Sequence, residues 1–157
     1  MNDLVKPEWM KKRQAEQEAT TTEQELRRQR ADAAALLIDR DGEKFWKDLK
    51  EKLAIAVEFL PDLKLEGLIS PQGKDALRIA VSKPGVFLNQ TYTDIFYNRD
   101  AKQLRCGLLN KGIYNLMFCV TGDGRVMVND LRDSGTMNAD GAAQHIMELM
   151  IDQIESQ

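Results

Sequence analysis

Few side chains in this sequence have the chemistry of a catalytic acid, base or nucleophile. His145 is the only histidine, and Cys106 and Cys119 are the only cysteines. On a helical wheel His145 falls nearly opposite the apolar stripe of its expected helix, which predicts that it faces solvent. Both cysteines lie in the middle of expected strands, whereas a nucleophilic thiolate needs a neighbouring base. These residues therefore favour structural roles over catalytic ones.

Motifs that would assign an enzyme or a metal site are missing from the sequence. It has no Gly-x-Ser-x-Gly nucleophile elbow and no Cys or His cluster with zinc-ligand spacing. The stretch 121–124 (Thr-Gly-Asp-Gly) lacks the ligand series of a calcium loop and the Gly-Lys-Ser/Thr of a phosphate loop, whereas Asp-Gly between strands is a strong hairpin signal. We therefore expect no catalytic residue, metal or cofactor.

A mixed polar and aromatic set on the expected strands is the best candidate for a ligand face. Asp94 lies between Tyr92 and Phe96, and Arg105 falls roughly opposite it if the hairpin closes across Asn98 and Gln103. An acid on a sheet face can line a ligand cavity and act as a base, but more often it forms a cross-strand ion pair. The residues expected to form this face are Tyr92, Asp94, Phe96, Arg105, Tyr114 and Asn115.

The spacing of apolar residues predicts the elements that position these side chains. Between Phe45 and Leu60 large apolar residues recur at three- and four-residue steps, which predicts a helix that Pro61 ends. After Leu65 the period changes to two, and a final helix starts at the N-cap Asn138. The strand-like runs lie near 77–81, 91–98, 103–109, 113–120 and 125–130.

The turns between these runs are too short to hold a crossover helix, so the strands must be antiparallel neighbours. The predicted fold class is therefore α+β: an antiparallel meander of five or six strands packed by helices, in the order helix, helix, sheet, helix. If Leu109 faces Ile113 across the 110–112 turn, the two thiols lie about 10 Å apart along the ladder, too far for a disulfide. Free thiols and the lack of an apolar leader run favour a cytoplasmic protein.

Residues 1–40 form a charged helical arm, and residues 41–157 form a single α+β domain. The arm is rich in good helix formers and carries equal numbers of basic and acidic residues. We expect the three threonines at 20–22 to interrupt it and Gly42 to end it. Trp9 and Met10 are an apolar pair on this arm, which could anchor it in a partner's groove or pack on the chain's own sheet.

Charge and hydropathy exclude two classes of partner. The net charge is −3, and acidic residues between the basic clusters of the arm cancel their field, so we expect no nucleic acid. The longest apolar-rich stretch, near 112–122, is about half as long as a membrane-spanning helix must be, so we expect no membrane.

The run 113–120 carries apolar side chains on both faces of the expected sheet. Ile113, Met117 and Cys119 share one parity, and Leu116 and Phe118 lie on the other. A sheet with helices on one side should have a polar second face, so we expect a cover here: the N-terminal helix, a second copy of the chain, or a ligand. A strand open to water on one broad face in a single chain would contradict this expectation.

Three functions follow from these features, in order of preference. The first is a non-catalytic cytoplasmic protein that acts through protein–protein contacts, as a homo-oligomer or an adaptor. The second is a small-molecule-binding domain in which the sheet curves around a helix and leaves a cavity. The third is an enzyme of unrecognised type, for which only Asp94 and the two thiols are available.

Overall fold

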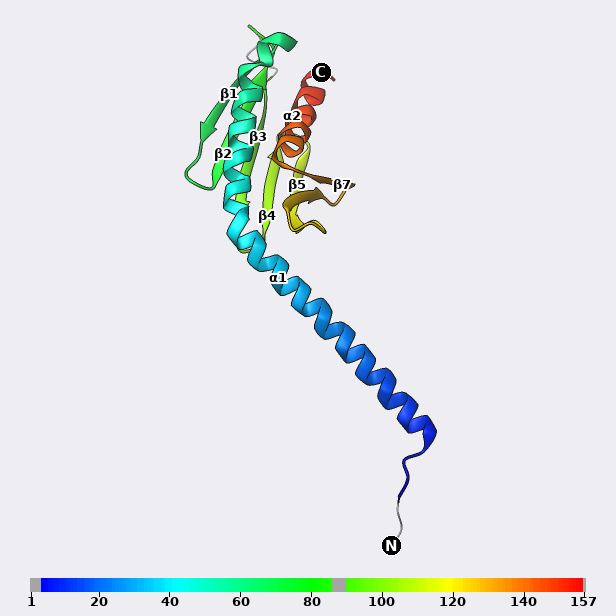
Figure 1. Ribbon diagram of the computed structural model, residues 1–157. Coiled ribbons are helices and arrows are strands. Elements are labelled where there is room, and N and C mark those ends of the chain that lie inside the picture. Colours follow the sequence, from blue (N-terminus) through cyan, green and yellow to red (C-terminus); the bar gives the residue numbers. More distant parts are fainter. Residues whose placement is uncertain (1–3, 86–89, 157) are drawn as a thin grey trace. The chain divides into compact units, whose positions relative to one another are not determined.

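The computed structural model describes residues 4–85 and 90–156, with the side chains of 133 and 134 left out. The chain divides into two compact units, Met1–Leu36 and Leu37–Gln157, and each is described by itself. The first helix, α1 (Glu8–Glu58), begins in one unit and ends in the other. A short 3-10 helix, η1 (Leu60–Leu63), follows it, and α2 (Ala139–Glu155) ends the fold (Figure 1).

Helix α1 is continuous, so the two expected N-terminal helices are one. The threonines at 20–22 do not interrupt it, because each hydroxyl donates to the carbonyl four residues earlier, at 2.9 Å. Gly42 does not end it either, since this residue is buried and stays helical. A Cβ at Gly42 would lie 2.7 Å from the Tyr97 hydroxyl, so glycine is required there by a close approach rather than by a turn.

The sheet has seven antiparallel strands in sequential order, which confirms the meander but exceeds the expected five or six strands. The two unexpected strands are those at the edges. The first edge strand ends at Pro71 and is mostly exposed. The last contains Gly135 and follows an irregular register at Asn129 and Asp130. The alternation of apolar and polar residues is therefore weak in both. The strands are β1 (Glu66–Pro71), β2 (Ala76–Ser82), β3 (Gln90–Asn98), β4 (Gln103–Leu108), β5 (Gly112–Val120), β6 (Val126–Asp130) and β7 (Asp133–Met137).

The turns set the register of the central hairpins. Asn98 pairs with Gln103, as expected. The β4–β5 turn closes with Leu108 opposite Gly112, so each β4 residue faces a β5 residue two positions nearer the start of β5 than predicted. The turn keeps three residues but lies one position earlier, and Asn110 and Gly112 take positive φ angles of 64° and 87° there. Cys106 therefore faces Tyr114, and both cysteines are free thiols.

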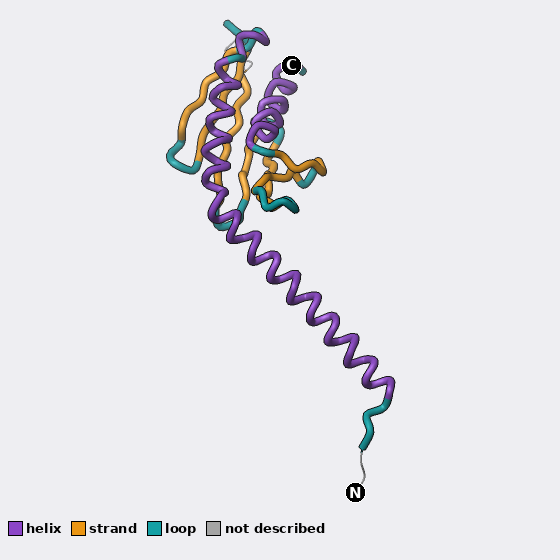
Figure 2. Tube along the Cα trace, in the orientation of Figure 1, coloured by secondary structure: helices purple, strands orange, loops and turns teal. Residues whose placement is uncertain are grey.

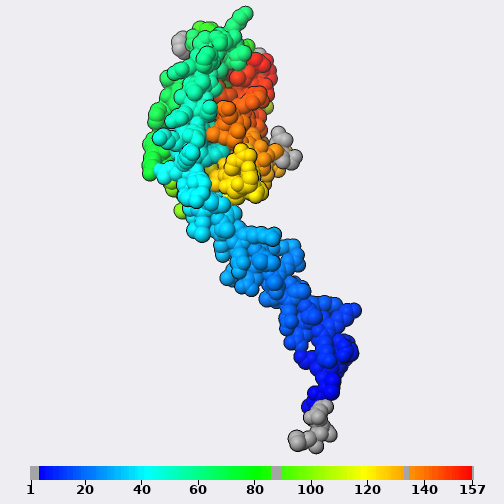
Figure 3. All heavy atoms as spheres, in the orientation of Figure 1, coloured from blue at the N-terminus to red at the C-terminus, as the bar shows by residue number. Residues whose placement is uncertain are grey.

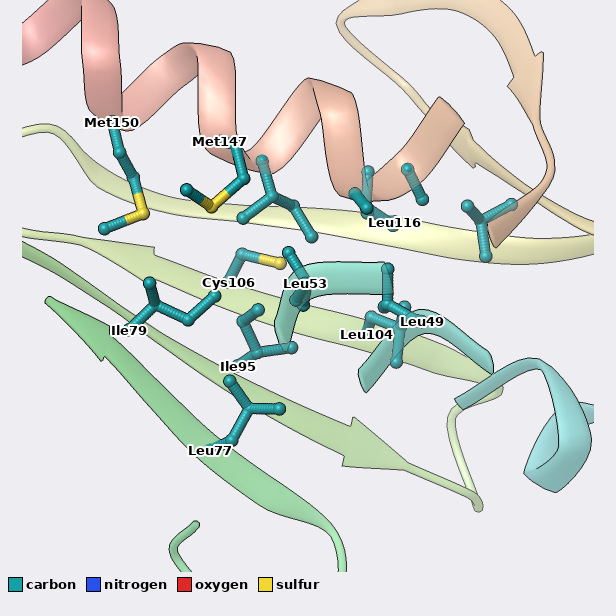
Figure 4. Close-up of a cluster of buried hydrophobic side chains, with 14 of the residues drawn as sticks. Leu49, Leu53, Leu77, Ile79, Ile95, Leu104, Cys106, Leu116, Met147 and Met150 are labelled. Atoms are coloured by element: carbon teal, nitrogen blue, oxygen red, sulfur yellow. The ribbon is translucent and has the colours of Figure 1, made fainter. Parts of the chain in front are cut away.

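One face of the sheet carries the core. The part of α1 in the Leu37–Gln157 unit and α2 both lie over this face (Figures 1 and 2), and Figure 3 shows their cyan-to-green and orange-to-red surfaces covering it. Leu49 and Leu53 of α1 and Met150 of α2 are fully buried against the strands (Figure 4). Burying such side chains contributes about 1.5–3 kcal/mol each, and this free energy keeps the two helices docked on the sheet.

Among the described residues, neither helix is both long and apolar enough to cross a membrane.

Candidate functional site

The face of the sheet that the helices do not cover brings most of the expected ligand-face residues together, and we call it the open face. The register places Arg78, Asp94, Gly107 and Ile113 in one row across β2 to β5. Phe96, Arg105 and Asn115 make the next row, and Leu68 and Tyr92 lie in the row before. We define the open face as Leu68, Arg78, Tyr92, Asp94, Phe96, Arg105, Gly107, Ile113, Asn115 and Met117.

Three large apolar side chains of the open face are exposed to water. Leu68 is 65%, Phe96 48% and Ile113 57% exposed, and they come from three different strands. Three large exposed apolar side chains on one face of a sheet, with polar groups between them, are the composition of an interaction surface.

An ion pair occupies the middle of the open face. The Nε and Nη2 atoms of Arg78 donate to the two carboxylate oxygens of Asp94, at 2.6 and 2.9 Å. The guanidinium also lies 4.3 Å from the centre of the Tyr92 ring, and the hydrogen bond to Asp94 raises the pKa of Arg78 above its ordinary value. Asp94 is therefore a cross-strand ion-pair partner. Its partner is Arg78 and not Arg105, which lies opposite Phe96.

Beside this ion pair the open face is bare backbone. Gly107 lies between Asp94 and Ile113 in the row, and a Cβ added to it would meet nothing nearer than the Asp94 carbonyl oxygen at 4.0 Å. Its φ angle is not among the positive ones. The chain's own packing therefore does not demand glycine here, and the position is a flat spot on which another surface can rest.

Tyr114 does not share the open face with the other expected ligand residues. Neighbouring residues of a strand point to opposite faces, so Tyr114 and Asn115 cannot lie on one surface. Tyr114 is 5% exposed in the core beside Cys106, and burial raises the pKa of its hydroxyl. Burial likewise raises the pKa of the Cys106 thiol to about 12, so this cysteine is no nucleophile at neutral pH.

The expectation of a sheet covered on both faces is wrong for the Leu37–Gln157 unit. On β5, Ile113 and Asn115 are exposed, and Met117 and Cys119 are only half-buried. Within the described residues of this unit, no helix lies over that face (Figure 2). The apolar residues of β5 are diluted by Arg78, Asp94 and other polar groups of neighbouring strands, which a reading of one strand does not weigh.

A buried polar pair on the covered side was missed by the sequence reasoning. His145 is not turned to solvent: its side chain is 20% exposed, and its Nε2 lies 2.9 Å from the Asp130 carboxylate, whose side chain is 4% exposed. The buried side of α2 is wider than the apolar stripe suggested, because Ala142 and Gln153 are also buried. The sheet end formed by β6 and β7 reaches this added side, and the residue pattern of α2 alone carries no signal of that contact.

Hydrogen bonds keep Asp130 ionised despite its burial. Burial alone would raise the pKa of this carboxyl, but the Arg132 amide donates to it at 3.0 Å and His145 bonds its other oxygen. The Arg132 guanidinium adds a contact at 3.5 Å, and the pKa of Asp130 is lowered overall. The group ties β6 to α2 and needs no ligand to explain it.

Trp9 and Met10 lie near the start of α1, in the Met1–Leu36 unit. They are 64% and 45% exposed. Their role as a partner contact stays a prediction.

In the described part of the chain, no three His, Cys, Asp or Glu side chains gather as metal ligands. The chain was compared with protein-family models, with curated proteins and with solved structures, and none of the three comparisons gave a match.

Proposed function

We propose that this is a non-catalytic protein that self-associates through the open face, two copies packing sheet against sheet. The observation that carries the proposal is the exposure of Leu68, Phe96 and Ile113 on one surface that neither helix of their unit covers. Antiparallel faces pack on one another about 10 Å apart, and this would remove the three side chains from water.

A second copy is the occupant that the charges favour. In a two-fold interface a surface meets itself, so a face with charge of one sign repels its twin. Here Arg78 and Asp94 neutralise each other within one chain, at 2.6 Å, so the middle of the face meets its copy as a neutral surface and Arg105 in the next row carries the remaining charge. Gly107 beside them allows the partner's side chains to come close to the backbone.

Self-association makes a catalytic role unnecessary for this surface. Asp94, the only acid proposed as a base, is occupied by Arg78. We further infer a reducing compartment such as the cytoplasm, since both cysteines are free thiols, one of them buried.

Phe96→Asp should disrupt the proposed dimer while leaving the fold intact. Phe96 is 48% exposed in the single chain, so its loss costs little folding energy. In the dimer the variant would lose a central apolar contact and would have to bury a carboxylate, with Arg105 on the neighbouring strand as its nearest cation. We expect light scattering to give a dimer mass for the wild type and a monomer mass for the variant, with the dissociation constant raised about 100-fold or more.

Phe59→Asp is the matched control. Phe59 is 62% exposed after the end of α1, away from the open face, and the same substitution there should leave the dimer unchanged. A wild type that stays monomeric at high concentration, or a Phe96→Asp variant as dimeric as the control, would refute self-association through this face.

A further inference from the structure

A cavity of about 390 Å³ lies on the covered side of the sheet, between the end of the β4–β5 hairpin and the last turns of α2. Its volume falls within the range of small-molecule sites. The sheet separates it from the open face, so ligand binding in this cavity would be independent of self-association. Its walls are formed by Leu108, Lys111, Tyr114, Arg132, Leu149, Asp152, Gln153 and Ser156.

The inner wall of this cavity is polar and fixed in place. Gln153 is 7% exposed, and its amide accepts a hydrogen bond from Thr91 at 2.9 Å and donates one to the Leu109 carbonyl at 2.6 Å. The Tyr114 hydroxyl is buried and, apart from a weak contact with the Cys106 thiol, has no hydrogen-bond partner among the described residues. Buried hydroxyls normally have a hydrogen-bond partner, so the Tyr114 hydroxyl is a polar group of this wall that is still able to form a hydrogen bond.

The charges and the apolar residues of the walls define the ligand. Lys111 and Arg132 supply two positive charges against one carboxylate, Asp152. Arg132 stacks over Tyr114 at 4.9 Å, and its closest contact with Asp130 is through Nε, at 3.5 Å, so its guanidinium is positioned at the cavity to meet another acceptor. Leu108 and Leu149 give the cavity an apolar lining between these groups.

We propose that this cavity binds a small carboxylic acid with an apolar body. The carboxylate is held between Lys111 and Arg132, and the hydrocarbon part lies against Leu108 and Leu149. The preference for an anion follows from the two cations, and the preference for an apolar body follows from the two leucines.

The test uses octanoate as the probe on the full chain, with backbone amide NMR shifts and calorimetry as the readouts. Saturable binding is expected, with shift changes at residues 108–114 and 149–156, and weaker binding of octan-1-ol and octylamine. Lys111→Gln should weaken octanoate binding about two- to fivefold, while Lys47→Gln, on the exposed side of α1, should not change it.

Leu149→Trp fills the cavity and should abolish octanoate binding. Leu149 is only half-buried, so the variant is expected to fold, and its amide spectrum checks this. Should it unfold, Lys111→Gln still decides, because Lys111 is exposed in a turn. The proposal is overturned if octanoate does not saturate, if its shift changes fall elsewhere, or if the alcohol or the amine binds as tightly.

Discussion

Asp130→Ala should lower the free energy of unfolding by about 1–3 kcal/mol, the cost of leaving buried hydrogen-bond donors without their acceptor. The Asp130 side chain is 4% exposed, and it accepts from the Arg132 amide and pairs with His145. Removing it leaves His145 and the Arg132 amide without their acceptor and loosens α2 from β6. Urea unfolding followed by circular dichroism measures the change.

Asp123→Ala is the control for this loss. The Asp123 side chain is 54% exposed in a turn, where it pairs with Arg125, so its removal should cost less than about 1 kcal/mol. Equal losses in the two variants would show that the Asp130 pair is not a structural tie.

The same carboxylate predicts how stability depends on pH. The pKa of Asp130 is lower in the folded chain than in the unfolded one, so its contribution is fully present above the unfolded value of about 3.9. It is lost as the pH falls through the folded value. Wild type should therefore lose more stability than Asp130→Asn between about pH 5 and pH 2, and parallel curves for the two proteins would contradict the lowered pKa.

Leu53→Ala should cost about 2–5 kcal/mol of stability. Leu53 is fully buried where α1 meets the sheet, among the side chains of Figure 4, so alanine leaves a cavity that rigid strands cannot close. Ile55→Ala, two residues along the same helix, removes a side chain that is 50% exposed and should cost less than about 1 kcal/mol. Denaturant midpoints for the pair measure the difference, and similar midpoints would mean that α1 does not dock on this side.

The period of the apolar residues was enough to predict the fold class. Alternation in β2 to β6 and the short turns between them determine an antiparallel meander, because no other pairing fits connections of that length. Local signals misled at Gly42, where a glycine that usually ends a helix is instead required by contact with Tyr97. The edge strands β1 and β7 were not predicted, because a strand that pairs with only one neighbour shows weak alternation of apolar and polar residues.

The candidate site was predictable in part. Alternation put Asp94 and Phe96 on one face, and the structure agrees, but Tyr114 was grouped with its neighbour Asn115 against the same rule. The Arg78–Asp94 pair needed the register between β2 and β3, which no single strand contains. His145 and Asp130 meet only because β6 and β7 reach the side of α2, a tertiary effect that a helical wheel does not include.

Gly107→Lys is the most direct test of the open face as an interface. A Cβ there has open space and the backbone is not strained, so we expect an unchanged melting temperature. The added side chain would stand between Asp94 and Ile113 in the middle row, where a dimer would have to bury its ammonium. Sedimentation equilibrium should therefore show Gly107→Lys as a monomer, and both the wild type and Gly122→Lys, altered in the β5–β6 turn, as dimers. A Gly107→Lys protein that associates as tightly as Gly122→Lys would contradict the account.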